Sequence, residues 1–397
     1  MAELNSNVGP RTLNPLVEQL DWIASNVRAA QPQVLRPWTR EHLIPEKTRG
    51  VLISGQRGVG KTTLLLASTQ RKALYFSADN PLVSAHSLSD LGAAAFAVGF
   101  EGLLIDEVHH ARDWSVQIKS LYDSHPRKFI WASDSSSLIL REGAFDLSRR
   151  LPRLEMPLLS FREYLALVGA GDYPTLPLGV PSLKDIKPLL DRTSLLADFV
   201  RYRREGMRPF FLEGFYAPKV LATLEKSIYH DVPFFVPQIH ENHLGLMNAV
   251  VGLLATSPVP TVNVESLCRD WSVGKEKAYA LLNALEYIGV LNIVGVAGRP
   301  RVGKGAKLLL ADPSLYACLG GNFGTAREAY VVTMLKGAGH AVFASKDESQ
   351  GDFEVAGLTV EVGGAGKKRK KSDFVIRDDV ETPSRSVIPM WCLGFLY

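Results

Sequence analysis

The chain has 397 residues, of which 46% are hydrophobic, 22% charged and 9% aromatic, and its mean hydropathy is +0.03. This balance is typical of globular proteins and excludes a wholly disordered chain. At roughly 100–200 residues per domain, the length allows several domains. Lys and Arg number 45 against 41 Asp and Glu, so the net charge of +4 does not by itself indicate a nucleic-acid partner.

Cysteine usage and the longest apolar run exclude further classes. Cys268, Cys318 and Cys392 lie far apart and form no CxxC pair, which excludes a disulfide framework and a cysteine zinc site. The longest uncharged apolar stretch, at 91–100, is far shorter than the ~20 residues that span a bilayer. Residues 1–10 lack the apolar core of a signal peptide. We therefore expect a cytoplasmic protein with no membrane partner.

The first part of the chain predicts a parallel α/β sheet. Residues 12–46 combine a helical pattern with a proline-punctuated stretch, which predicts a helix and an irregular lead-in. Strand-like runs then occur at 51–54, 73–77, 102–106 and 128–133, with helical or mixed segments between them. Because these runs are continuously apolar, they predict strands buried on both faces.

The remainder predicts three further segments. Residues 161–240 are mainly helical and are expected to form a lid or linker. Residues 241–312 predict three helices and a β-hairpin with a basic tip, the pattern of a winged-helix domain. Residues 313–397 predict a small α/β domain, with a helix at 326–336 and strands at 341–344, 353–355, 358–362 and 373–376.

The most specific motif is GQRGVGKT at 55–62, which fits GxxxxGK[ST] without a mismatch. A predicted strand precedes it and a predicted helix follows, as a phosphate-binding loop requires. Lys61 would reach the β- and γ-phosphates, and the Thr62 hydroxyl would ligate Mg²⁺. The residues expected to bind ATP are Gly55, Gln56, Arg57, Gly58, Val59, Gly60, Lys61, Thr62 and Thr63.

The partner motif is LLIDE at 103–107, an apolar strand that ends in two carboxylates. Such a strand places Asp106 at the edge of the sheet where open α/β sheets bind ligands. Asp106 would hold Mg²⁺ through water, and Glu107 would polarise the attacking water. His109 and His110 follow, but neighbouring residues face different directions, so we expect solvated or packing side chains rather than metal ligands.

Two later features complete the predicted catalytic set. In ATPases with an extra strand between the P-loop strand and the acidic strand, a polar residue after that extra strand contacts the γ-phosphate. Ser133 is expected in this role with Ser135 behind it, and a plain serine-rich turn is the alternative. Arg149 and Arg150 suit an arginine finger supplied to a neighbouring subunit, with a surface salt bridge as the alternative.

The motifs GQRGVGKTT, LLIDEVHH, DWSVQIKSLYD, SDSSSLIL, DLSRR and LSFREYL, in this order, resemble a family of prokaryotic AAA+-type ATPases. These proteins join an AAA domain to a C-terminal domain of unknown function, and the likeness extends to the closing IPMWCLGFLY. In that family a small residue is usual where this chain has Asp134. The resemblance implies an α/β P-loop ATPase core of the ASCE/AAA+ type at 1–160, a winged-helix module and a homo-oligomer, expected to be a hexameric ring.

The C-terminal domain is similar to the PD-(D/E)xK nuclease fold. Glu328 on a helix, Asp352 before a strand and Glu361 on the next strand could hold Mg²⁺ for phosphodiester hydrolysis. The motif needs Glu-x-Lys, but this chain has Gly363 at the lysine position, and Lys367 or Lys368 could supply the charge from a shifted position. We therefore expect a degenerate nuclease-like fold kept for binding or assembly.

The winged-helix segment carries the residues expected to contact DNA. In such domains, helix and wing present cations to phosphates. These residues are Lys275, Lys277, Arg299, Arg301, Lys304 and Lys307. A protein-contact module is the alternative, and the run KKRKK at 367–371 is a second basic segment, with a solvated loop as its alternative.

The combined prediction is an oligomeric, ATP-hydrolysing AAA+-type motor that remodels or translocates branched or duplex DNA. A signalling or defence switch is the alternative, with nucleotide state controlling assembly and the C-terminal domain acting as effector or assembly module. An ATP-dependent nuclease is a third hypothesis.

Overall fold

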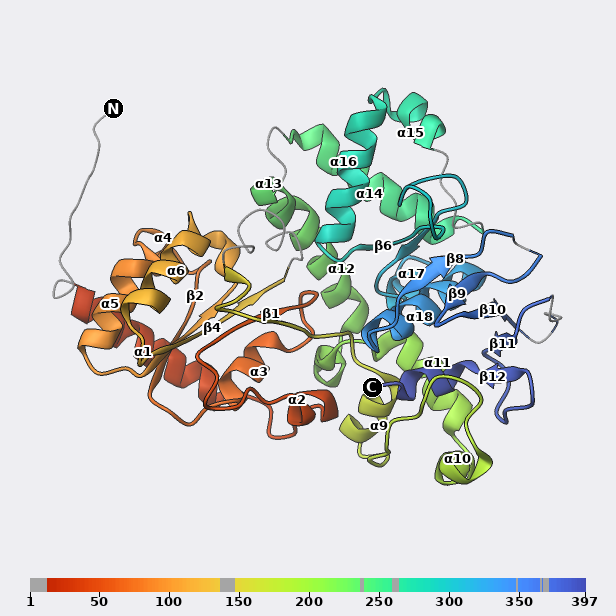
Figure 1. Ribbon diagram of the computed structural model, residues 1–397, viewed down its shortest axis with the longest axis horizontal. Helices are drawn as coiled ribbons and strands as arrows, with labels where there is room; N and C mark the ends of the chain where they lie inside the picture. The colour runs from red at the N-terminus through yellow and green to blue at the C-terminus, as the bar shows by residue number, and fades with distance from the viewer. Residues whose placement is uncertain are drawn as a thin grey trace. The chain divides into compact units, whose positions relative to one another are not determined.

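The structure, a computed structural model, describes residues 13–135, 147–235, 239–258, 264–347, 349–364, 366 and 371–397 (Figure 1). The chain forms two compact units. The first comprises Met1–Leu35 and Thr39–Met156, and the second comprises Arg36–Trp38 and Pro157–Tyr397. The domain boundaries expected from the sequence stay predictions. No helix in the described ranges is long and apolar enough to cross a membrane.

The first unit is built on a parallel five-stranded sheet of order β2-β3-β4-β1-β5. Its strands are β1 (Gly50–Ser54), β2 (Ala73–Ser77), β3 (Gly102–Asp106), β4 (Phe129–Asp134) and β5 (Arg153–Glu155). The predicted parallel sheet is confirmed, including the extra strand β4 between the P-loop strand β1 and the acidic strand β3. The short edge strand β5 was not predicted.

Continuous burial explains why the apolar runs become central strands. Every residue of β1, β3 and β4 is buried, and Ile53, Leu104 and Ala132 are fully inaccessible to solvent. Helix α1 packs on β2, and α3 packs on β3 and β4. The helices of this part are α1 (Asn14–Ala29), α2 (Pro37–Glu41), α3 (Lys61–Ala67), α4 (Pro81–Ser84), α5 (Leu88–Ala97), η2 (Val108–His110) and α6 (Trp114–Ser124).

The second unit begins with helices, as expected for 161–240. They are α9 (Phe161–Leu167), α10 (Leu183–Leu190), α11 (Leu195–Glu205), η3 (Pro209–Glu213), α12 (Tyr216–Lys226), η4 (Ser227–Asp231) and α13 (Val232–Phe235). Three helices follow, α14 (Glu241–Thr256), α15 (Val264–Trp271) and α16 (Lys275–Tyr287), and then the antiparallel pair β6 (Leu291–Val294) and β7 (Lys307–Leu310). The predicted three helices and hairpin are therefore present.

A second sheet closes the chain, with strand order β12-β11-β10-β9-β8. Helices α17 (Ser314–Cys318) and α18 (Phe323–Gly337) precede it. Its strands are β8 (Val342–Ala344), β9 (Phe353–Val355), β10 (Leu358–Gly363), β11 (Phe374–Arg377) and β12 (Val387–Pro389), followed by η5 (Met390–Phe395). Strands β8, β9 and β10 pair antiparallel, whereas β10, β11 and β12 pair parallel. The mixed α/β unit was expected, but β12 and η5 were missed.

The segment LSFREYL anchors the second unit. Ser160 and Glu163 form a capping box at the start of α9. Glu163 also accepts two hydrogen bonds of 2.7 Å from Arg36, a buried ion pair in which both charges are satisfied. Ser160 Oγ and Arg162 Nε donate to the main-chain oxygen of Tyr397 at 3.1 and 3.0 Å. The LSFREYL segment and the closing residues thus bind each other.

Candidate nucleotide site

The P-loop connects β1 to α3 through residues whose backbone suits glycine. Gly58 and Gly60 have φ values of 77° and 105°, a region that side chains with a Cβ rarely adopt. A Cβ on Gly55 would lie 2.5 Å from the main-chain oxygen of Met156. The glycines of the motif are therefore required by the loop's own geometry.

Lys61 lies inside this loop. Its Nζ donates to the main-chain oxygens of Gly55 and Gln56 at 2.8 and 3.1 Å, and the residue is 5% exposed. Burial lowers the pKa of Lys61, while the nearby carboxylates of Glu107 and Asp106 oppose that shift. Because the carbonyl groups that accept these hydrogen bonds are neutral, they leave the charge of the ammonium group available to an anion.

Asp106, at the end of β3, is the centre of an oxygen-rich cluster. Thr62 Oγ1 donates to its Oδ2, and Ser133 Oγ donates to its Oδ1. Tyr75 OH, on the neighbouring strand β2, lies 3.2 Å from Oδ2. Burial, reinforced by the charge of Asp106, raises the pKa of Tyr75, so the phenol stays a proton donor. The adjacent oxygens of Thr62 and Asp106 form the hard donor set that suits Mg²⁺.

Glu107 follows in a left-handed backbone conformation, with φ 48° and ψ 48°. Such a conformation is costly for a residue with a Cβ and turns the side chain toward the loop. Oε1 accepts from Arg57 Nη1 at 3.2 Å, and Oε2 accepts from Ser135 Oγ at 2.6 Å. Burial alone would raise the pKa of Glu107, but the positive charges of Lys61 and Arg57 and the Ser135 hydroxyl outweigh it and lower the pKa.

Ser133 and Ser135 contact two different carboxylates, whereas Ser135 was expected to lie behind Ser133. Ser133 contacts the carboxylate of Asp106, whereas Ser135, expected to lie behind it, contacts Glu107. Tyr75 was missed because nothing near it in the sequence marks it. Only the pairing of β2 with β3, in which Tyr75 is opposite Leu104, brings it to the site.

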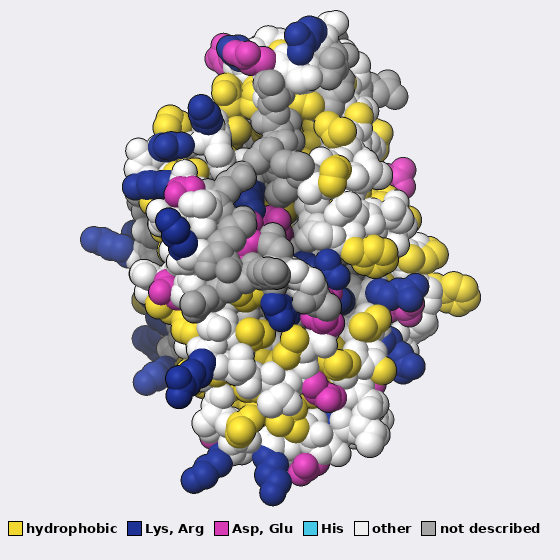
Figure 2. Space-filling model, turned by 90° about the vertical axis from the view of Figure 1, so that its right-hand side faces the viewer, with side chains coloured by type: hydrophobic (Ala, Val, Ile, Leu, Met, Phe, Trp, Pro, Cys, Tyr) yellow, Lys and Arg dark blue, Asp and Glu magenta, His cyan; other side chains and the backbone are white. Residues whose placement is uncertain are grey.

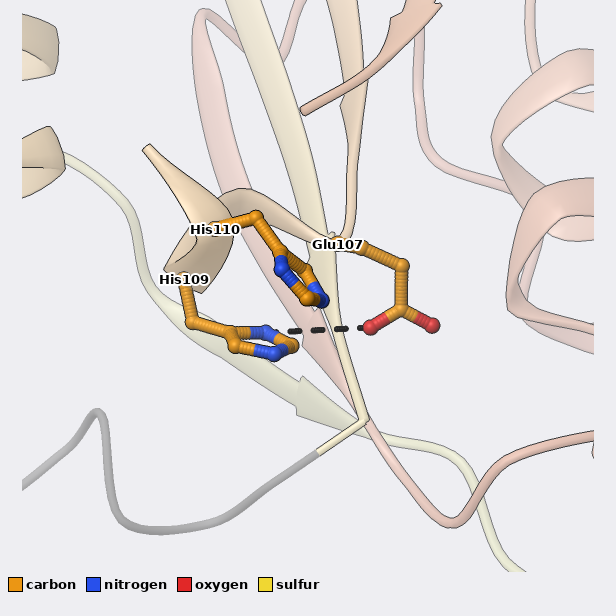
Figure 3. Close-up of side chains that lie close together, drawn as sticks. All are labelled: Glu107, His109 and His110. Carbon is orange, nitrogen blue, oxygen red and sulfur yellow. Dashed lines mark ion pairs between the residues drawn. The ribbon is translucent and has the colours of Figure 1, made fainter. Parts of the chain in front are cut away.

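The expectation for the two histidines was wrong about their directions. The imidazole rings of His109 and His110 lie 4.1 Å apart at 39°, and both face the carboxylate of Glu107 (Figure 3). His109 Nδ1 is 2.9 Å from Asp134 Oδ2 and 3.7 Å from Glu107 Oε2. One ligand atom from each of Glu107, His109 and His110 lies within 4.8 Å of the others, a group that could hold a metal ion. The left-handed residue and the short helix η2 redirect the chain here.

The two arginines proposed as a finger have different surroundings. Arg150 Nε and Nη2 each lie 2.8 Å from a carboxylate oxygen of Asp123, a two-point ion pair within the chain. Arg149 is exposed. The geometry therefore favours the salt-bridge alternative for Arg150 and leaves Arg149 as the finger candidate. The segment 136–146, which includes the rest of the serine run, lies outside the described residues.

Lys307 is not on an exposed wing, which corrects the expectation. It begins β7, is 8% exposed, and its Nζ lies 2.6 Å from Glu328 Oε2 and 3.4 Å from Asp352 Oδ1. Its side chain points toward α18 and the second sheet because every residue of β7 is buried. We call Lys307, Glu328 and Asp352 the C-terminal acidic cluster. Glu361, on β10, is fully buried.

Other basic residues of this segment also meet carboxylates. Arg301 pairs with Glu286, and Lys275 Nζ lies 2.7 Å from Glu265 Oε1. Arg299 Nη1 donates to the main-chain oxygen of Lys304 at 3.3 Å, and both residues are exposed. Lys277 is half-buried. On the face drawn in Figure 2, basic side chains of the described residues are interspersed with acidic and apolar ones. Lys367 and Lys368 lie outside the described residues.

Comparison with known proteins agrees with this site. Residues 47–165 match the model of a family described as "AAA domain". The uncharacterized protein MJ1637 of Methanocaldococcus jannaschii is 29% identical over 277 residues, which cover 64% of this chain and 58% of that protein. This chain thus matches little more than half the length of that relative.

Some solved structures are similar at low scores. A RuvB variant of Thermotoga maritima covers 73% of this chain and 91% of its own at 18% identity, with a TM-score of 0.32. A structure titled "Structural Basis for Katanin Self-Assembly" covers 59% of this chain and 82% of its own at 17% identity, with a TM-score of 0.28. The family match, the sheet order and the P-loop together define residues 47–165 as an AAA-type ATPase domain.

Proposed function

We propose that the protein binds ATP with Mg²⁺ and hydrolyses it at the edge of the first sheet. One observation carries this proposal. The hydroxyl of Thr62, from the P-loop, and the carboxylate of Asp106, from the acidic strand, are hydrogen-bonded, although the residues are 44 positions apart. This contact joins the two motifs that an ATPase of this class needs.

Each side chain has a role that its contacts allow. Lys61 would exchange its carbonyl partners for phosphate oxygens, which are stronger acceptors of a charged donor. Thr62 and Asp106 would hold Mg²⁺, which when bound neutralises phosphate charge. Glu107, kept ionised by its lowered pKa, would orient the attacking water and accept its proton. Ser135 fixes one oxygen of that carboxylate.

The site is expected to be completed by another subunit. Arg149 is exposed near the end of the nucleotide domain, and no residue described here gives it a carboxylate partner in an ion pair. A homo-oligomer, in the form of a hexameric ring, would bring this guanidinium to the phosphates bound by its neighbour. Arg150 would instead hold the segment in place through Asp123.

The first proposal is that the energy of ATP hydrolysis drives DNA remodelling or translocation. It rests on Arg299, Lys304 and Lys277, together with the run at 367–371. The nucleotide-controlled switch is the second proposal, and one observation favours it. Arg301, Lys275 and Lys307 are engaged by carboxylates of the same chain, which leaves less positive charge for phosphates than the sequence indicated.

Steady-state ATPase assays with single-stranded, duplex and four-way-junction DNA at two salt concentrations separate the two proposals. Stimulation that falls with salt, and is reduced in Arg299→Ala/Lys304→Ala, supports the DNA motor. Turnover unaffected by every DNA supports the switch. Absence of any turnover, with and without DNA, would contradict ATP hydrolysis itself.

A further inference from the structure

We propose that Glu107, His109 and His110 form a binding site for a transition-metal ion of the Zn²⁺ type, and that its occupation removes Glu107 from catalysis. The inhibitory part rests on the ATPase function proposed above, whereas the metal site itself does not. This ion would be distinct from the Mg²⁺ that accompanies ATP, because imidazole nitrogens suit Zn²⁺ and oxygen ligands suit Mg²⁺.

The spacing of the three side chains is close to that of a zinc site. Bonds of about 2.0–2.2 Å in a tetrahedral site place neighbouring ligand atoms about 3.4 Å apart. Here one ligand atom of each residue lies within 4.8 Å of the other two. Small side-chain rotations would close the set. Figure 3 shows both rings beside the carboxylate of Glu107.

Asp134 supplies the support that metal-binding histidines usually have. Its Oδ2 lies 2.9 Å from His109 Nδ1 and 3.2 Å from the main-chain nitrogen of His109, and both side chains are 1% exposed. A carboxylate in this position orients the imidazole and fixes its tautomer. With the proton on Nδ1, the lone pair is on Nε2, so the imidazole is in the neutral form that binds metals and Nε2 would be its ligand atom.

Occupation of the site would compete with the present partners of Glu107. The carboxylate now accepts hydrogen bonds from Arg57 and Ser135, and a bound ion would take the place of at least one of them. A metal-bound carboxylate has its charge withdrawn and can no longer accept a proton from water at neutral pH. Zn²⁺ at concentrations that fill the site should therefore stop hydrolysis while ATP stays bound.

Metal binding is tested directly on the nucleotide-free protein, without an activity assay. Co²⁺ serves as the spectroscopic probe and Zn²⁺ as the competitor in titration calorimetry. We expect one ion per chain with visible absorption typical of nitrogen and oxygen ligands, and an affinity about tenfold or more lower in His110→Ala. His110 is half-buried, so this variant should fold. Asp134→Asn, which keeps the shape but weakens support of His109, should also lower the affinity.

Two controls test whether histidines outside the proposed site bind the metal. His86→Ala changes an exposed histidine of the same unit, and His240→Ala/His243→Ala removes a pair whose rings lie 5.4 Å apart. Neither should change the affinity. Unchanged affinity in His110→Ala, or loss of binding only in the His240/His243 variant, would overturn the proposed site. Metal that binds at the site but leaves ATP turnover unchanged would overturn the inhibitory part. An inactive but metal-binding protein would count against the ATPase proposal alone.

Discussion

The nucleotide site and the C-terminal acidic cluster contain the same ingredients, a lysine among carboxylates, but the two lysines have different partners. Lys61 donates to two main-chain oxygens, which do not cancel its charge. Lys307 contacts the carboxylates of Glu328 and Asp352, which do. The first lysine, although the carboxylates of Glu107 and Asp106 are near, can exchange neutral partners for an anionic ligand, whereas the second is already in direct ion pairs. What identifies a site is how its charge is compensated rather than which residue types it contains.

The two regions also differ in whether their side chains could hold a metal ion. Glu107, His109 and His110 bring their ligand atoms within 4.8 Å of one another, whereas in the described residues Glu328, Asp352 and Glu361 form no such group. A cation already occupies the space between Glu328 and Asp352, in the form of the Lys307 ammonium. A divalent ion there would have to displace it. We therefore keep the hypothesis that the nuclease-like unit serves binding or assembly.

The largest expected effect is the loss of ATP binding when Lys61 is replaced. Lys61→Ala removes the ammonium group from the P-loop, so binding of ATP should fall below detection. Lys304→Ala, an exposed lysine of the second unit, is the matched control. Binding is measured with a fluorescent ATP analogue. Retained affinity in Lys61→Ala would contradict the role of this charge.

The next effect concerns completion of the nucleotide site from outside. Arg149→Ala should reduce turnover by roughly 10³–10⁵-fold, as arginine fingers do. Mixing it with Lys61→Ala should partly restore activity, because some interfaces would pair an intact loop with an intact Arg149. Arg150→Ala, which breaks the ion pair with Asp123, should keep most activity. No recovery in mixed oligomers shown to form would exclude a shared site.

The third effect tests whether the charges of the C-terminal acidic cluster neutralise one another. Lys307→Met removes the ammonium group that contacts Glu328 and Asp352, and should lower the free energy of unfolding of the second unit by about 3 kcal/mol. Urea unfolding measures this change. Adding Glu328→Gln should recover part of it. Unchanged stability of Lys307→Met would show that the cluster is not self-compensated and would reopen it as a cation site.

The smallest effect is a shift in pH dependence. Arg57 helps to lower the pKa of Glu107, so the carboxylate stays ionised to a lower pH than an isolated glutamate. Arg57→Ala should raise that pKa, and turnover should begin to fall at a higher pH as the solution is acidified. The acid limb of the kcat profile measures it, with Gln56→Ala as control. An unmoved or lowered limb would exclude Glu107 as the titrating base.

The features that the sequence predicted correctly are those formed by residues close together in the chain. The P-loop, its strand and its helix are contiguous, and continuous apolar runs mark buried strands, so the parallel sheet was accessible. The contacts that were not predicted depend on pairing between segments far apart in the chain. Tyr75 reaches Asp106 through strand pairing, and Asp134 reaches His109 across 25 residues.

Two errors show how local patterns mislead. Adjacent histidines usually diverge, but the left-handed Glu107 and the turn of η2 bring the rings of His109 and His110 together. Lys307 follows a basic segment and shares its charge, yet it is the first residue of a buried strand and turns inward. In both cases one backbone feature reversed the direction of a side chain, which residue type alone does not encode.

The measurement that tests the account most directly is ATP binding and turnover by Glu107→Gln. The amide keeps the shape of the side chain but cannot accept a proton, so turnover should fall by roughly 10²–10⁴-fold. Affinity for ATP should stay at the wild-type level, since Lys61 and Thr62 are untouched. Glu101→Gln, a half-exposed glutamate just before β3, should behave as wild type. Normal turnover by Glu107→Gln would contradict the assignment of the acidic strand.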